Sequence, residues 1–157
     1  MELDKTTGSN VIDGKEFDCC ESTLMIINRE HPLPGFGPDI MKVASPFGGG
    51  VGRWGSACGA ATGIVMALGL AYGTDGEESL EDFQEKREHV NELSKSLMKE
   101  FEEAFGSINC GDLFFNLFPW TEDSEVRYNE MNAQGLVKCD DYINWAAKRV
   151  LETIGEG

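Results

Sequence analysis

Apolar residues recur at helical spacing along most of the chain. In the acidic segment 77–105 they are separated by 7, 3, 4, 4 and 4 positions, which places them on one face of a long helix. The same reasoning predicts helices over residues 16–29, 56–72 and 138–154, a helical turn over 39–43, and at most a short helix over 110–118. The polar stretch 119–134 is predicted to be a loop, and no segment alternates as a strand does. The pattern predicts an all-α, single-domain bundle of about five helices.

The length of 157 residues suits one domain. Residues 1–15 are polar and contain two glycines, so we expect a flexible N-terminal arm followed by a single helical domain over 16–157. The start of the chain has no secretory pattern, and the longest apolar run, about 57–72, is too short to span a bilayer. These features predict a cytoplasmic protein with no membrane association.

The charge changes the list of expected partners. Thirteen Lys and Arg against 28 Asp and Glu give a net charge of −15. A surface with this much negative charge repels phosphate backbones and anionic lipids. Nucleic acid is therefore excluded as a partner, and a basic protein is favoured.

Four of the five cysteines lie at expected helix starts: Cys19, Cys58, Cys110 and Cys139. The first turn of a helix has unpaired N–H groups and a partial positive charge, and both stabilise a thiolate. Helix starts can meet at one end of a bundle, so the four thiols could form one site. The alternative is that they are scattered, buried and unreactive, since a free cysteine packs as a small apolar residue. Cys20 projects about 100° away from Cys19 on a helix and is assigned a packing role, although the choice between the two is open.

The glycine run 48–55 comes shortly before Cys58. It contains G-x-G-x-x-G, but no strand precedes it and the Lys-Ser/Thr ending of a phosphate loop is missing. We therefore interpret it as a loop whose backbone packs closely against a neighbour and delivers Cys58 to its place.

These residues resemble a known family. The segment F-G-G-G leading to C-G-A-A-T-G over 58–63 is similar to the central part of the family named for its C…GCAxxG…C…C pattern, with Cys and Gly in reversed order. F-D-C at 17–19, F-G-S-I-N-C at 105–110 and C-D-D-Y-I at 139–143 resemble its other three cysteine segments. The resemblance covers residues 17–154. Members are described as redox-active, and a related domain of split-Soret cytochromes is associated with an iron–sulfur cluster.

The resemblance implies that Cys19, Cys58, Cys110 and Cys139 hold an iron–sulfur cluster, 2Fe–2S or 4Fe–4S, and that the protein transfers electrons to an unknown redox partner. Together with the apolar stretch 114–118, the resemblance also suggests that the protein is a homodimer. Covalent haem is not expected, because no C-x-x-C-H is present. Two alternatives stay open: a cluster-free thiol–disulfide protein and an interaction module with a structural zinc site.

Other residues with catalytic potential are less informative. His31 and His89 pair with no cysteine as a base, and position 86 is Lys, so a di-iron E-x-x-H motif is absent. The sequence therefore indicates no hydrolase or transferase site and leaves an oxidoreductase component open. Arg53 could balance the charge of a cluster. The aromatic residues are expected in the core, and some could shield the cysteine site from water. They are Trp54, Phe114, Phe115, Phe118, Trp120 and Trp145.

Overall fold

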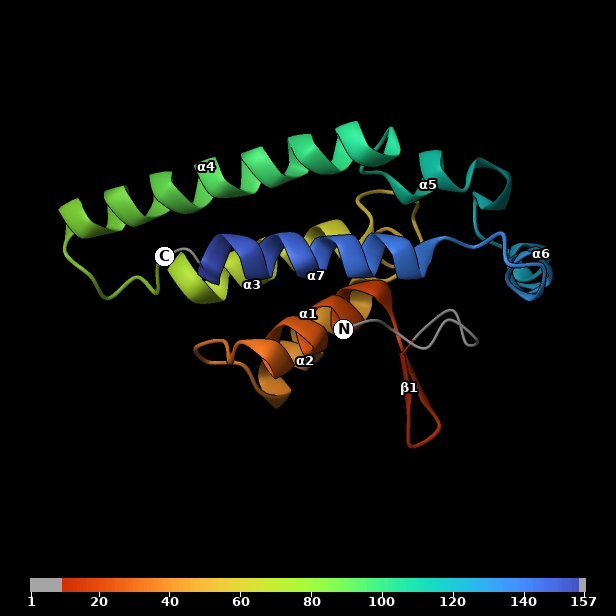
Figure 1. Ribbon diagram of the computed structural model, residues 1–157, viewed down its shortest axis with the longest axis horizontal. Helices are drawn as coiled ribbons and strands as arrows, with labels where there is room; N and C mark the ends of the chain where they lie inside the picture. The colour runs from red at the N-terminus through yellow and green to blue at the C-terminus, as the bar shows by residue number, and fades with distance from the viewer. Residues whose placement is uncertain (1–9, 156–157) are drawn as a thin grey trace.

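The computed structural model describes residues 10–155, which form a helical domain with one small hairpin (Figure 1). The α-helices are α1 (Cys19–Glu30), α2 (Pro38–Ala44), α3 (Gly59–Tyr72), α4 (Leu80–Phe105), α5 (Cys110–Leu113), α6 (Glu122–Ala133) and α7 (Cys139–Gly155). Two 3₁₀ turns, η1 (Ser45–Phe47) and η2 (Phe115–Leu117), and two strands, β1 (Asn10–Ile12) and β2 (Lys15–Phe17), complete the described elements.

The helix boundaries follow local chemistry. Helix α1 begins with a capping box, in which the Asp18 carboxylate accepts from the Glu21 amide at 2.9 Å and the Glu21 carboxylate accepts from the Asp18 amide. Helix α4 ends at Gly106, whose φ of 91° is the left-handed conformation that favours glycine. These boundaries confirm the helices predicted over 16–29, 39–43, 56–72, 77–105 and 138–154 to within a few residues.

Three helices form the centre of the core. Helices α1, α3 and α7 contact one another pairwise, and α4 lies along α3 with its N-terminal end projecting past the bundle (Figure 1). Fully buried side chains from all four helices meet here; they include Leu24, Ile27, Ile64, Leu68, Phe101, Ile143 and Val150. Each such side chain contributes roughly 1.5–3 kcal/mol through burial.

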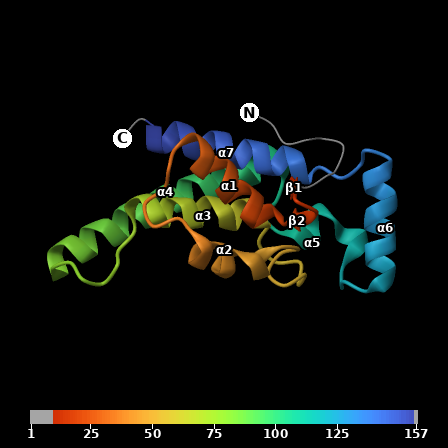
Figure 2. The same cartoon turned by 90° about the horizontal axis from the view of Figure 1, so that it is seen from below.

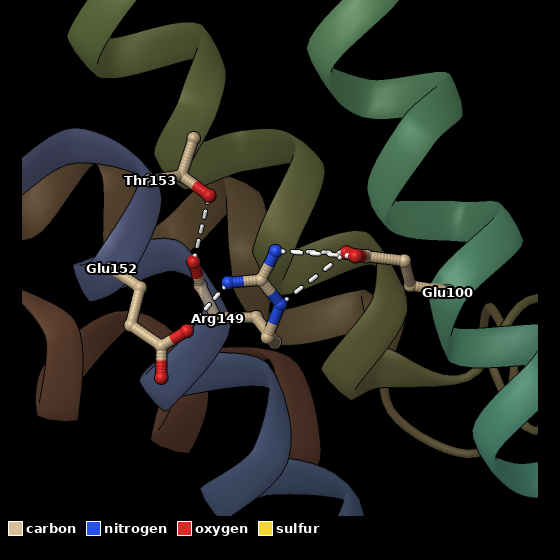
Figure 3. A network of polar contacts seen from close by, with 4 residues as sticks. All are labelled: Glu100, Arg149, Glu152 and Thr153. Carbon is tan, nitrogen blue, oxygen red and sulfur yellow. Dashed lines mark hydrogen bonds and ion pairs between the residues drawn. The ribbon is translucent and has the colours of Figure 1, made fainter. Parts of the chain in front are cut away.

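An ion-pair network joins the last helix to the longest one. The Arg149 guanidinium on α7 donates to the Glu100 carboxylate on α4 at 3.0 Å and to Glu152 at 2.6 Å (Figure 3). Figure 3 also shows the Thr153 hydroxyl donating to the Arg149 carbonyl, at 2.8 Å. The network links α7 to α4 at the surface of the bundle. No helix within residues 10–155 is both long enough and apolar enough to cross a membrane.

Two segments differ from the sequence-based expectation. The predicted loop 119–134 is wrong, because residues 122–133 form α6, set across one end of the bundle (Figure 2). Thr121 caps this helix and acidic residues fill its first turn, so capping and the helix dipole stabilise it without an apolar face. Residues 10–17 pair as an antiparallel hairpin within and just beyond the expected arm. Residues 1–9 lie outside the described part of the chain, so the arm stays a prediction.

Candidate redox centre

All four predicted site cysteines stand at helix starts. Cys19, Cys110 and Cys139 are the first residues of α1, α5 and α7, and Cys58 is the N-cap of α3. The predicted positions are therefore confirmed. Helices α1, α5 and α7 start at the end of the bundle near α6 (Figure 1).

The four thiols lie within interaction range of one another. The Cys19 thiol hydrogen-bonds to Cys139 and lies within the electrostatic reach of Cys58 and Cys110. Cys110 in turn interacts with Cys58 and Cys139. Residues from both ends of the chain thus converge on one place.

A backbone bridge holds Cys58 beside Cys110. The Cys58 amide donates to the Ile108 carbonyl at 2.7 Å, and the Cys110 amide donates to the Ser56 carbonyl at 2.7 Å. These two bonds form an isolated antiparallel bridge between Ala57 and Asn109. The starts of α3 and α5 are locked together by it, and with them their cysteines.

A close helix contact brings Cys19 to the same place. A Cβ atom on Gly59 would lie 2.8 Å from both the Cys19 Cβ and the Cys20 amide nitrogen, closer than real Cβ contacts come. One turn later, a Cβ on Gly63 would lie 2.9 Å from the Cβ of Thr23. The glycines of the C-G-A-A-T-G segment therefore let α1 approach α3 closely.

The glycine run before Cys58 is a left-handed turn. Residues 49–53 all have φ between 60° and 73°, including the non-glycine residues Val51 and Arg53. The turn closes where the Ser56 amide donates to the Gly50 carbonyl at 2.9 Å. A Cβ on Gly50 would lie 2.5 Å from the Ser56 carbonyl oxygen, so only glycine fits there. The predicted role, a closely packed loop that leads to Cys58, is confirmed.

Burial and hydrogen bonds set the protonation of the thiols. Burial raises the pKa of Cys58 to about 11, although the Ala60 and Ala61 amides at the helix start act to lower it. Burial also raises the pKa of Cys110 to about 12. The pKa of Cys19 is raised because its thiol donates to Cys139, and the same bond lowers the pKa of Cys139. Cys139 is therefore the thiol that most readily ionises.

A residue that the sequence did not indicate also contacts Cys139. The Tyr128 hydroxyl, on α6, donates to the Cys139 Sγ at 3.9 Å and helps to lower its pKa. Because residues 119–134 were predicted to be a loop, no pattern pointed to Tyr128. The capping residue Thr121 and the acidic turn after it were the available sign of a helix there.

A cleft of about 500 Å³ opens from the thiols to the surface. Cys19, Cys110 and Cys139 line it, whereas Cys58 does not. Its aromatic walls confirm that some aromatic residues border the site; they are Phe17, Phe114, Phe118, Trp120 and Tyr128. Trp54 and Phe115 were expected in the core, and this is wrong, because they are 85% and 73% exposed.

The remaining candidates lie away from the cleft. Cys20 is buried, and its thiol lies 3.6 Å from the Met66 Sδ, as its packing role predicts. His31 is the C-cap of α1, at the opposite end of that helix from Cys19, and His89 packs edge-on against Tyr72. Within residues 10–155, no three His, Cys, Asp or Glu side chains are arranged as a group that could hold a metal ion.

Comparison with family models identifies the chain. Residues 17–153 match the family described as "Putative redox-active protein (C_GCAxxG_C_C)". The chain belongs to this family. The match confirms the resemblance to the family, and the matched range includes Cys19, Cys58, Cys110 and Cys139. No curated protein and no solved structure matches the chain.

Proposed function

We propose that Cys19, Cys58, Cys110 and Cys139 bind an iron–sulfur cluster and that the protein transfers electrons one at a time. The convergence of four thiols from four helix starts carries this proposal. The redox description of the C_GCAxxG_C_C family supports it. When bound, the cluster would supply a one-electron couple whose potential the surrounding protein sets.

The donor set fits such a cluster in its chemistry, since four thiolates are its usual ligands. Cys19 holds its proton in the bond to Cys139, and its interactions with Cys58 and Cys110 are electrostatic. Ligation requires that bond to break and the neutral thiols to lose their protons. Loading the site should therefore release protons to solvent, a readout independent of electron transfer.

Residues around the cysteines would set the potential of the cluster and limit its contact with water. The amides of Ala60 and Ala61 lower the pKa of Cys58, and the Tyr128 hydroxyl donates to the Cys139 sulfur. Hydrogen bonds to ligand sulfur favour the more negatively charged, reduced state. The aromatic walls of the cleft limit the access of water on one side of the site.

A dithiol function is the second candidate, and one observation favours it. Cys19 and Cys139 are hydrogen-bonded, and the pKa of Cys139 is lowered while that of Cys19 is raised. A cysteine that ionises more readily beside a neutral thiol is a pair from which a disulfide can form once an oxidant takes two electrons. All five cysteines are free thiols in this structure.

The deciding measurement is the content of iron, zinc and acid-labile sulfide, with a visible spectrum, on protein purified without oxygen. We expect iron and sulfide in similar amounts, lost in Cys58→Ala and kept in the control Cys20→Ala, which removes the neighbouring buried thiol. Circular dichroism checks that both variants stay helical. Zinc alone would reassign the site as structural. A colourless, metal-free protein with a reversible Cys19–Cys139 disulfide would establish the dithiol function instead.

A further inference from the structure

Three apolar side chains stand exposed near the mouth of the cleft. Val51, Trp54 and Phe115 are 44%, 85% and 73% exposed; together we call them the cleft rim. Val51 and Trp54 belong to the left-handed turn, and Phe115 begins η2. The two segments are tied together, because the Gly111 amide donates to the Gly55 carbonyl at 2.8 Å.

The rim lies close to the thiols. Arg53 and Phe114, which precede Trp54 and Phe115, line the cleft. Trp54 itself lines the adjoining hollow formed by residues 52–54 and 118–120. The cleft itself reaches Cys19, Cys110 and Cys139. A protein seated on the rim would therefore cover the opening through which these cysteines approach the surface.

The unfavourable backbone conformation of the left-handed turn suggests that the cleft rim has a function. Val51 and Arg53 hold left-handed conformations that are unfavourable for residues with a Cβ, above all for a β-branched one. Their side chains are exposed, so burial does not offset this cost. Strain of this kind is typical of functional sites.

The charge around the rim is negative. Glu16 and Glu125 line the cleft together with Asp18, whose pKa burial raises to about 7, and Arg53 is the one basic side chain among the described lining residues. The Arg53 guanidinium lies over the Trp120 ring, 5.3 Å from its centroid. The whole chain carries −15.

We propose that the cleft rim is the docking surface for a basic redox protein. Apolar side chains supply the contact area, and the surrounding carboxylates attract positive charge and orient the partner. A second copy of this chain fits less well, because two chains of −15 repel each other. Binding at the cleft rim does not depend on the proposed function, but the electron transfer that follows does. In that step one electron passes from the reduced centre to the oxidised partner, with no bond formed or broken.

Oxidised cytochrome c, a small basic haem protein, is a suitable probe. Its binding is measured by calorimetry at low ionic strength, and its reduction by stopped-flow absorbance. In Trp54→Ser we expect binding at least fivefold weaker and reduction correspondingly slower, because an exposed aromatic side chain is a typical interface anchor. The matched control is Leu80→Ser on α4, since Leu80 is 72% exposed far from the cleft.

A second pair of variants tests the charge. Glu125→Gln should weaken binding about twofold and flatten its dependence on salt, while Glu92→Gln, an exposed carboxylate on α4, should change neither. A neutral quinone, which needs no protein interface, should be reduced equally fast by all variants.

The outcomes separate the two proposals. Trp54-dependent binding without iron and sulfide would support the docking surface and refute the cluster. A cluster whose electron transfer is equally fast in Trp54→Ser and wild type would overturn the docking surface alone. Self-association of the wild type that Trp54→Ser abolishes, with no binding of cytochrome c, would also overturn it and assign the rim to a second copy.

Discussion

The contact at Gly59 offers a sharp test of how the cysteine site is built. The substitution Gly59→Ala adds one Cβ at a point 2.8 Å from the Cys19 Cβ and the Cys20 amide nitrogen. Neither neighbour can rotate away, since one is a Cβ and the other is backbone. To reach an ordinary contact of at least 3.4 Å, the start of α1 must move from α3 by about 0.6 Å.

Overpacking of this kind costs about 1–3 kcal/mol. For a chain of this length, each kcal/mol lowers the Tm by about 2–4 °C, so Gly59→Ala should lower it by about 2–12 °C. The displaced part of α1 carries Cys19. If the cluster proposal is right, iron bound per chain should fall as well.

Gly69→Ala is the matched control, because Gly69 lies in the same helix and a Cβ there meets nothing within 4 Å. It should stabilise the protein by about 0.5–1 kcal/mol through helix propensity alone. Thermal unfolding followed by circular dichroism measures both variants. Equal Tm values for Gly59→Ala and Gly69→Ala would refute the argument that Gly59 is required for the approach of α1.

Three further perturbations probe the ion pair, the tyrosine and the cap. Arg149→Met should lower the free energy of unfolding by about 0.5–1 kcal/mol, because it removes a partly exposed ion pair with Glu100. The loss should be smaller at high salt, and urea titrations at two salt concentrations measure it. Tyr128→Phe should make the midpoint potential of the loaded protein more negative in a redox titration, because it removes the hydrogen bond to Cys139 that stabilises the reduced state. Burial raises the pKa of Asp18 from 3.8 to about 7, so its contribution to stability is present below pH 3.8 and lost as the pH rises through 7. Asp18→Asn keeps a capping side chain and should gain stability relative to wild type over this window in unfolding titrations at pH 4 to 8.

Each of these has a control and a contradicting result. Lys148→Met removes an exposed charge next to Arg149 and should leave stability within about 0.5 kcal/mol of wild type; an equal loss in both variants would argue against the ion pair. Tyr72→Phe, at the far end of α3, should not move the potential, and an unchanged potential in Tyr128→Phe would show that its hydroxyl does not tune the site. A constant stability difference between Asp18→Asn and wild type from pH 4 to 8 would contradict the raised pKa.

Helical periodicity and glycine stops predicted most of the fold. Helix α4 has apolar residues at spacings of three, four and seven and ends at Gly106, so its length and buried face could be read from the sequence. Helix α6 could not be read in this way, because its stability comes from the Thr121 cap and the acidic first turn rather than from an apolar face. The hairpin at 10–17 escaped prediction because its residues are mostly exposed and show no alternation.

The cysteine positions were predictable for a local reason, and their surroundings were not. A cysteine at a helix start is visible in sequence, and four of them suggested one site. Which side of a loop an aromatic residue faces depends on contacts far away in the chain. Trp54 illustrates this: it lies in a left-handed turn whose backbone packs inward, so the side chain is left in solvent.

The left-handed turn links the cysteine site to the cleft rim. Trp54 precedes Cys58 by only four residues, and the segment between them is fixed by the bridge of Ala57 to Asn109 and by the contact of Gly55 with the Phe118 ring. A Cβ on Gly55 would lie 2.9 Å from that ring, so this contact is close, although less tight than the 2.5 Å contact at Gly50. The exposed tryptophan and the buried thiol are therefore held in one rigid unit. A partner docked at Trp54 would meet the cysteine site at a fixed distance, as rapid electron transfer without a conformational step requires.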